Sequence, residues 1–491
     1  MSINRSILKL AVPSILANIT VPLVGMVDIA VAGHLSTEAA TLIGGIAIGS
    51  MLFDLLYWNF GFLRIGTGGL AAQAFGRGDR RECARILTRA LAISLGIALL
   101  LISIQWIFVK AAFLVVDCTP EVRELASQYF FIRIWAAPAT LSLMAFKGWF
   151  IGMQDSVSAM ICDVTVNCMN VLLSIILALG LTVGDSVIIP SIGFAGVAAG
   201  TVAAQWIGLL TALAIIVFKY RRNTFNLLQS TDLRNMFRGS ETRRFFVMNR
   251  DLFIRSLCFI AIYIGFTVIS ARYGDTLLAV SSILMKLLMI FSYFTDGFAY
   301  AGEALTGRYI GEGNRQMVSA TVRWTFVWSM SIALIFIGIY HFAGTPLLKV
   351  MTSDAVVIGA AGEYMPWLLL MPVVGCAAFT WDGIFIGATA SRQMRDSMLW
   401  AVVAFAAVYA VGVLGLQGFV PEIPAPDSLL TLEDSAGKVI RNVGADDSTA
   451  YQRTAMHVLM AAYFAHLLAR TLYLTVNWRK SWERHCWNRE I

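Results

Sequence analysis

Long apolar stretches alternate with short polar breaks along almost the whole chain. Each stretch approaches the roughly 20 apolar residues that a helix needs to cross the hydrocarbon core of a bilayer. Only helices and closed barrels satisfy their backbone in lipid, and barrel strands would alternate over about ten residues instead. The pattern therefore predicts twelve membrane helices, at 7–33, 41–69, 86–109, 125–152, 159–182, 193–218, 251–271, 277–306, 320–342, 363–388, 397–416 and 454–476.

Composition supports an all-α integral membrane protein. Of the 491 residues, 58% are hydrophobic and only 14% are charged, against about 25% charged residues in soluble domains. Mean hydropathy is +0.73. The first apolar run, from Leu10 to Ala32, is too long for a signal peptide and contains Asn18 and Asp28, so we expect a retained membrane helix.

The positive charges gather in particular loops, which makes the net charge of +7 a signal of topology rather than of nucleic-acid binding. With an even number of helices, the basic loops all fall on one side, while the last opposite loop, 417–452, is acidic. The positive-inside bias then predicts that both termini are cytoplasmic and that the protein lies in the cytoplasmic (inner) membrane. The basic positions include Arg77, Arg80, Arg81, Arg85, Arg221, Arg222, Arg234, Arg238, Arg392, Arg395, Arg479 and Lys480.

The chain repeats itself at an offset of 235 positions. Gly76-Arg-Gly-Asp-Arg80 resembles Gly311-Glu-Gly-Asn-Arg315, and Gly148-Trp-Phe-Ile-Gly152 resembles Gly383-Ile-Phe-Ile-Gly387. Six helices per half make the two halves parallel repeats about an axis along the membrane normal. We predict a lobe at 1–218, a basic cytoplasmic connection at 219–250 and a second lobe at 251–491 that includes the outer loop 417–452. Two such lobes that rock about a central cleft give alternating access, which needs no enzyme chemistry.

Asp28 is the first candidate for a functional group within the membrane, where ionisable residues are costly and rarely idle. It lies six residues before His34, which we place at the outer end of the helix. That spacing puts the carboxyl group roughly 9 Å below the surface, where exchange of a proton would suit an ion-coupled carrier. The alternative is an aspartate that only bonds a neighbouring helix.

The fifth helix carries a polar stripe at spacings of four, seven and eleven residues, which places its members on one helical face. The members are Asp163, Asn167, Asn170 and Ser174. Such a stripe faces a cavity or another helix rather than lipid. We assign Asn170 and Ser174, at about the depth of Asp28, to cation coupling. Candidates that line or support the substrate cavity are Asn18, Asp54, Asp163 and Asn167.

In the second half, Asp296, Glu303 and Asp382 are candidates for a second ion site. Asp296 and Glu303 are seven residues apart and share a face, so a structural network with Lys286 is an equal alternative. In the first half, Arg64 and Lys147 lie at the inner depth of Asp163. Mutual pairing or snorkelling of the cations competes here with a role in a cytoplasmic gate.

Several of these motifs together resemble the MATE (multidrug and toxic compound extrusion) family, in its DinF-like branch. The similar segments are Asn18 to Leu35, Gln73-Ala-Phe-Gly-Arg-Gly78, Ala137-Pro-Ala139 with Gly148-Trp149, Pro372-Val-Val-Gly375 and Asp382-Gly-Ile-Phe-Ile-Gly-Ala-Thr389. They are collinear over nearly the whole chain.

The resemblance implies two six-helix lobes and export of organic cations or amphipathic compounds in exchange for H+ or Na+, with no cofactor. It also implies that Asp28 is the coupling residue. Asn170 matches an asparagine of this branch, whereas Ser174 stands where the branch carries an aspartate. Asp28 is therefore left as the main ionisable group at this depth.

Other functions remain as alternatives. A flippase for lipid-linked precursors would want cations along the cleft to hold pyrophosphate, and the candidates are few. A membrane-embedded transferase would need a metal or catalytic motif, and the five histidines and seven cysteines show no such spacing. A channel would show a filter loop or charged rings. We therefore expect no enzyme activity and no metal site, small-molecule substrates, no nucleic-acid partner, and a monomer in the bilayer.

Overall fold

A computed structural model describes residues 2–33, 35, 39–114, 116, 118–183, 186–221, 240–417, 431–433, 439–442 and 445–483. Three features predicted from the sequence therefore lie wholly or mostly outside the described residues. These are His34, most of the basic connection 219–250 and most of the outer loop 417–452.

Within the described residues, 12 helical segments are long and apolar enough to cross a membrane, which confirms the prediction. Two of the crossings are interrupted by short 3-10 turns, η1 (Asn59–Gly61) and η2 (Ile134–Ala136), so that α2 with α3 and α5 with α6 each make one span. The helices are α1 (Ile3–Gly33), α2 (Ala39–Trp58), α3 (Phe62–Gly76), α4 (Arg80–Ala112), α5 (Pro120–Arg133), α6 (Ala137–Gly152), α7 (Ser156–Leu179), α8 (Phe194–Lys219), α11 (Ser240–Ala271), α12 (Asp275–Gly311), α13 (Arg315–Met351), α14 (Ala355–Gly387), α15 (Ser391–Gln417) and α16 (Ala445–Glu483).

Most predicted spans are shorter than the observed helices, as where 320–342 corresponds to Arg315–Met351. One boundary differs for a structural reason. The fifth span was expected to reach residue 182, but α7 ends at Leu179 because Gly180 adopts a φ of 83°, which glycine tolerates and which stops the helix. The β-branched residues that follow form a hairpin of β1 (Leu181–Val183) and β2 (Ser186–Ile189), in which Leu181 pairs with Ile189. A second short hairpin joins β3 (Thr431–Glu433) and β4 (Val439–Asn442).

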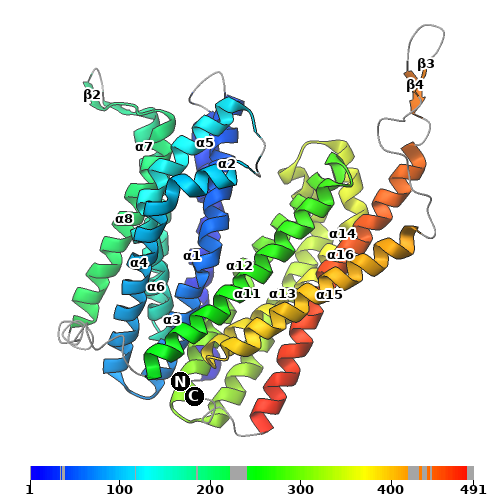
Figure 1. Cartoon of the computed structure of the whole chain (residues 1–491). Coiled ribbons are helices and arrows are strands. Elements are labelled where there is room, and N and C mark those ends of the chain that lie inside the picture. The colour runs from blue at the N-terminus through cyan, green and yellow to red at the C-terminus, as the bar shows by residue number, and fades with distance from the viewer. Residues whose placement is uncertain are drawn as a thin grey trace.

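The helices form two bundles, α1 to α8 and α11 to α16, as Figure 1 shows. Within the first bundle α7 packs on α8 and α3 on α6, and within the second α12 packs on α14 and α15 on α16. The bundles meet mainly where α12 contacts α1 and α3. The start of α1 and the end of α16 lie at the same end of the molecule, which we call the termini end, and the bundles diverge from there toward the far end (Figure 1).

The internal repeat reappears in the packing. Gly148 of α6 lies so close to α3 that a Cβ atom would collide with the carbonyl oxygen of Arg64. Gly383 of α14 approaches α12 in the same way, at the carbonyl oxygen of Ala299. Gly148 and Gly383 are 235 residues apart, and so are Arg64 and Ala299. The glycines are thus required for close helix approach at matching places in each lobe.

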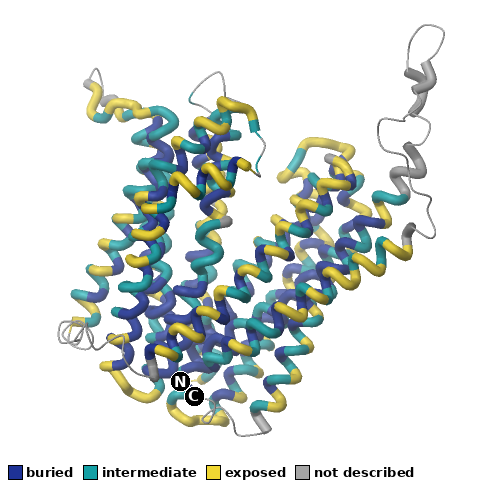
Figure 2. Tube along the Cα trace, in the orientation of Figure 1, coloured by how far each residue is buried: buried dark blue, intermediate teal, exposed yellow. Residues whose placement is uncertain are grey.

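The surface fits a lipid environment. Buried residues concentrate between the helices (Figure 2), whereas large apolar side chains stand exposed on the outside of the bundles. Leu99, Ile107 and Phe342 are 65%, 70% and 85% exposed. Because soluble proteins rarely expose apolar patches of this kind, these side chains identify the lipid-facing surface.

Candidate functional site

Asp28 lies in α1 and is only 6% exposed. Ser174 of α7 lies beside its carboxyl group, and Arg133 of α5 acts on it electrostatically. One carboxyl oxygen, Oδ1, is buried without a hydrogen-bond partner. Since buried polar atoms are nearly always bonded, this oxygen is an exception among the buried polar atoms of the first lobe.

Asn170 and Ser174 complete this polar junction between α1, α7 and α8. The Asn170 Nδ2 atom donates to Thr201 Oγ1 at 2.9 Å, while Asn170 Oδ1 is buried without a partner. The Ser174 hydroxyl donates to the carbonyl oxygen of Val197 at 3.4 Å. Gly200 permits this geometry, because a Cβ atom there would collide with the backbone of Ser174. The junction thus holds two orphan oxygens and a single carboxylate.

The rest of the helix-5 stripe has other partners. Asn167 Nδ2 donates to Thr20 Oγ1 of α1 at 2.5 Å, so it joins two helices. Asp163 pairs with Lys147 of α6 at 2.6 Å, so of the alternatives left open for these residues the structure shows pairing here, while Arg64 pairs elsewhere. Asn18 Nδ2 donates to the carbonyl oxygen of Tyr293 in α12 at 3.2 Å, and so connects the two lobes.

Asp54 of α2 is exposed, in contrast to Asp28. Arg133 acts on it from the same lobe and Lys286 of α12 from the other lobe. Lys286 is itself exposed, and its effect on Asp54 is electrostatic and acts from one lobe on the other. The sequence analysis missed Arg133, although an arginine inside a predicted span was a visible signal. Its guanidinium donates to the Tyr129 hydroxyl at 3.1 Å and covers the ring of Phe53.

The acidic residues of the second lobe are tied to cations. Asp382 accepts hydrogen bonds from Arg255 of α11, at 2.5 Å, and from Arg470 of α16. Neither arginine was among the candidates. Arg470 is only 1% exposed, and its position inside the last predicted span could have identified it. Asp296 has Arg64, Lys147 and Arg255 as its cationic electrostatic neighbours.

Glu303 of α12 is paired with Arg64 of α3 at 3.1 Å, an ion pair between the two lobes. Its side chain is fully buried, whereas that of Arg64 is 15% exposed. Arg64 also lies over the Tyr300 ring, 4.5 Å from its centre. The sequence analysis considered a structural network of Asp296 and Glu303 with Lys286. In the structure the cation that pairs with Glu303 is Arg64 instead.

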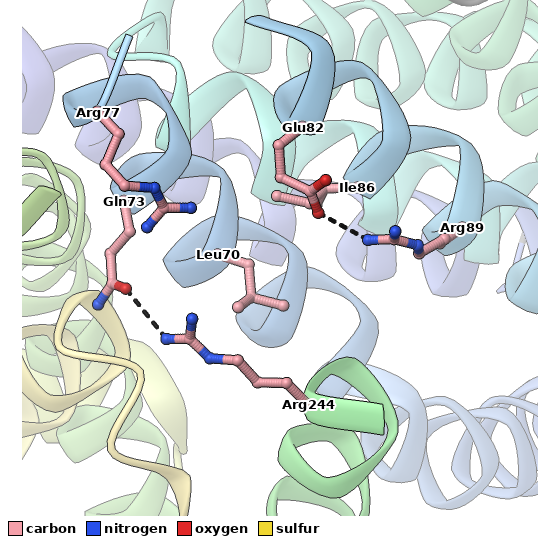
Figure 3. A pocket seen from close by; sticks show the side chains of 7 residues that line it. All are labelled: Leu70, Gln73, Arg77, Glu82, Ile86, Arg89 and Arg244. Carbon is pink, nitrogen blue, oxygen red and sulfur yellow. Dashed lines mark hydrogen bonds and ion pairs between the residues drawn. The ribbon is translucent and has the colours of Figure 1, made fainter. Parts of the chain in front are cut away.

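A compact polar cluster lies at the termini end, between α3, α4 and α11 (Figure 3). Gln73 and Arg244 point toward one another and bond at 3.1 Å, while Glu82 pairs with Arg89 at 2.7 Å. The cavity among them measures about 10 Å³, which is room for one water molecule. This cavity therefore admits no molecule larger than water.

Just outside the membrane spans, Asp155 begins α7 and bonds Lys219 Nζ at 2.9 Å and the Tyr220 hydroxyl at 2.7 Å. Burial alone would raise the pKa of Asp155. The hydrogen bonds from Lys219, Ser158 and Tyr220 outweigh it and hold the pKa below its usual range. This carboxylate therefore serves to fix the end of the helix pair α7 and α8.

Across the residues that the structure describes, no group of three or more His, Cys, Asp or Glu side chains is arranged to hold a metal ion.

Comparison with known proteins agrees with the architecture. The MatE family model matches residues 13–177 and again 252–412, once in each half. DNA damage-inducible protein F of Escherichia coli K12 is 34% identical over 407 residues, which cover 82% of this chain and 85% of that protein. A probable multidrug resistance protein NorM of Photorhabdus laumondii is 25% identical, with 79% and 83% of the two chains covered.

Solved structures share the fold. An outward-facing conformation of a multidrug resistance MATE family transporter of the MOP superfamily has a TM-score of 0.77 at 16% identity, with 98% of this chain and 97% of that chain covered. A crystal structure of MATE in complex with MaL6 also has a TM-score of 0.77, at 15% identity and with 99% and 98% covered. The chain is therefore a multi-pass membrane protein that belongs to the MatE family of multidrug efflux transporters.

Proposed function

We propose that this protein is a secondary active exporter that exchanges protons for small amphipathic or cationic compounds, with Asp28 as the coupling carboxylate. The observation that carries the proposal is the buried Asp28 side chain with its orphan oxygen, at the junction of α1, α7 and α8. An ionisable group at this depth is costly unless its protonation is used. Alternating access then follows from rocking of one lobe against the other.

The composition of the junction favours a proton over sodium. A proton needs one carboxylate, whereas a sodium ion needs several oxygen ligands and is held better by more than one negative charge. Asp28 is accompanied here by the neutral side chains of Asn170 and Ser174. With a serine at position 174, the junction carries a single charge to exchange.

The substrate class follows from the lobes that face one another toward the far end. The exposed Asp54 offers a negative charge to a cationic substrate. When no substrate is bound, Lys286 of the other lobe can balance that charge. Asn18, Asp163 and Asn167 support the helices around this space through the bonds described above. Specificity rests on shape and on this one carboxylate.

We further propose that the protein acts as a monomer in the cytoplasmic membrane, with both termini inside. Arginines gather at the termini end, at the starts of α4, α13 and α15 and at the end of α16. By the positive-inside rule, this end faces the cytoplasm. The lobes are joined at this end and diverge away from it, so the transport path opens outward.

A lipid-linked precursor flippase is less well supported. Such a protein needs cations free to bind pyrophosphate. Arg64, Lys147, Arg255 and Arg470 are instead paired with carboxylates.

The test is transport in proteoliposomes. Purified protein would be challenged with a fluorescent cationic dye under an imposed proton gradient or sodium gradient. Wild type should move dye with the proton gradient alone, and Asp28→Asn should abolish this movement. Asp54→Asn is the matched control, because it removes an exposed carboxylate. It should weaken dye affinity while movement remains proton-driven.

Movement by the sodium gradient alone would refute the proton assignment. If neither gradient moves any cation through wild type, the export proposal fails and flipping of labelled lipid should be measured in the same vesicles.

A further inference from the structure

Two turns at matching places in the repeats have an unusual backbone. Gln154, after α6, has a φ of 64°, and Thr389, after α14, has a φ of 55°. They are the two non-glycine residues with positive φ in the described chain, and they are 235 positions apart. Glycine adopts this conformation freely, but a β-branched threonine there is a true outlier. Strain retained twice at equivalent places points to a shared function.

The side chain of each strained residue reaches the opposite lobe. Gln154 Nε2, in the first lobe, donates to the carbonyl oxygen of Ala304 in α12 at 2.7 Å. Thr389 Oγ1, in the second lobe, accepts a hydrogen bond from Gln73 Nε2 of α3 at 3.1 Å. The same hydroxyl accepts from Arg244 Nη2 at 2.8 Å.

Gln73 is held from several directions at this contact. Its amide nitrogen also donates to the carbonyl oxygen of Gly387 at 3.0 Å, and its amide oxygen accepts from Arg244 at 3.1 Å. Gln73 is 2% exposed. Because Gln73 belongs to the first lobe and Gly387, Thr389 and Arg244 to the second, each of these bonds crosses the lobe interface.

The backbones of the lobes also touch here. A Cβ atom on Gly69 or Gly76 of α3 would collide with the carbonyl oxygen of Ile386 or Arg308 of the other lobe. A Cβ atom on Gly311 of α12 would collide with the carbonyl oxygen of Gln73. The interface at the termini end is therefore as close as two helix backbones allow. It must come apart if the path is ever to open at this end.

We propose that Gln154 and Thr389 are the two latch residues of the gate that closes the transport path at the termini end. This proposal rests on the alternating access described under the proposed function. The left-handed backbone closes the last turn of each helix, and from that position each side chain bonds the other lobe. The two latches differ in chemistry. Gln154 donates to a backbone carbonyl group of the other lobe, whereas Thr389 accepts from the Gln73 side chain of the other lobe and is also bonded by Arg244 of its own lobe.

A latch and a purely structural turn predict different effects of the same substitutions. If the turns only connect helices, Gln154→Gly and Thr389→Gly relieve strain and leave the gate unchanged. If the side chains are latches, the same substitutions keep the fold and loosen the gate. A hydrogen bond contributes enough to change an equilibrium by about fivefold. We therefore expect about fivefold more opening for each of Gln154→Gly and Thr389→Gly, because each variant loses one side-chain bond that crosses the lobe interface.

Hydrogen exchange of the full-length protein, followed by mass spectrometry, would measure this opening. Peptides that cover 66–76 and 301–311 should exchange about fivefold faster in the two glycine variants than in wild type. Peptides from 454–476 should exchange at the wild-type rate in both. Thr389→Ser, which keeps the hydroxyl, should restore slow exchange. The matched control is Gln105→Ala, because Gln105 Nε2 bonds only within its own helix, to the carbonyl oxygen of Ile102.

Wild-type exchange at 66–76 and 301–311 in both glycine variants would overturn the proposal, as would equal acceleration in Gln105→Ala or Thr389→Ser. A general acceleration that includes 454–476 would indicate unfolding and would also count against a latch. The measurement needs no substrate. A wild type that moves no dye therefore refutes the export proposal without changing the reading of the exchange data.

Discussion

The ion pair between Arg64 and Glu303 allows a quantitative prediction, because its two members differ in exposure. The Nη1 to Oε2 distance is 3.1 Å, the Glu303 side chain is fully buried, and that of Arg64 is 15% exposed and lies over Tyr300. The second carboxyl oxygen of Glu303, Oε1, is buried without a hydrogen-bond partner. Loss of Arg64 therefore leaves a buried acid with no compensation, whereas loss of the Glu303 charge leaves an arginine that still reaches solvent and a ring.

The magnitudes follow from this asymmetry. At an effective dielectric constant near 20, the attraction across 3.1 Å is about 5 kcal/mol, and desolvation offsets much of it. Removal of one partner of a buried pair costs about 3–5 kcal/mol, while replacement of both by apolar residues is often nearly neutral. Because the pair joins the lobes, the cost falls on the state that is closed at the termini end. Arg64→Met should shift the balance toward opening by about a hundredfold or more, since 1.4 kcal/mol is a factor of ten.

The milder variants complete a double-mutant cycle. Glu303→Gln should shift the balance about tenfold, because Arg64 keeps the Tyr300 ring and partial solvation. The double variant Arg64→Met with Glu303→Met should lie within about fivefold of wild type. The two positions are thus expected to be strongly non-additive.

Spin-label distances would measure the populations. Labels at Arg85→Cys in α4 and Arg315→Cys in α13, both exposed positions at the termini end, report the separation of the lobes. Arg64→Met should show the largest fraction of long distances, Glu303→Gln less, and the double variant almost none. Equal effects of the two single variants, or a double variant worse than either, would refute the reasoning from exposure and pairing.

Three further predictions test other parts of the structure. Gly311→Ala should favour opening at the termini end by about fivefold or more, since overpacking costs about 1–3 kcal/mol. Gly96→Ala, at a position with open space around it, should match wild type in the same distance measurement. Asp155→Asn keeps a helix cap but loses the charge, so it should lower the thermal unfolding temperature at pH 7. The Asp155 pKa is depressed in the folded state, so the ionised carboxylate stabilises the protein fully above the unfolded pKa near 4. This stabilisation is lost as the pH falls through the pKa of the folded state. A difference in unfolding temperature between variant and wild type that persists at strongly acidic pH would contradict this explanation. Ser174→Asp adds a second carboxylate beside Asp28 and should make dye transport respond to a sodium gradient, which wild type should not; an unchanged response would count against the single-carboxylate explanation of proton selectivity.

The number and placement of the membrane helices could be read from the sequence because hydropathy over some 20 residues is a local property. The depth of polar groups was readable for the same reason, since a helix advances by a fixed rise per residue. Asp28 and Ser174 were thus expected at one depth, and the structure brings them together. The offset of 235 residues predicted equivalent positions in the two lobes, as Gly148 and Gly383 show.

Local irregularities were harder to foresee. The end of α7 at Leu179 depended on the backbone conformation of Gly180, and apolar β-branched residues beyond it suit a strand as well as a helix. Gln154 and Thr389 were visible only as ordinary residues two positions after a repeated glycine. Their positive φ closes the last turn of α6 and α14, where Asp155 N bonds Phe150 O and Ala390 N bonds Phe385 O, and such caps usually carry a glycine that would have signalled them.

The pattern along the chain was enough to tell which side chains carry charge within the membrane, how deep they lie and on which helical face. Their partners became known from the folded arrangement alone. Glu303 pairs with Arg64, 239 residues away, and Asp382 takes Arg255 and Arg470 together. Such pairs depend on how each helix is rotated and how one lobe docks on the other. Packing between distant segments fixes both of these, and no local pattern along the chain records them.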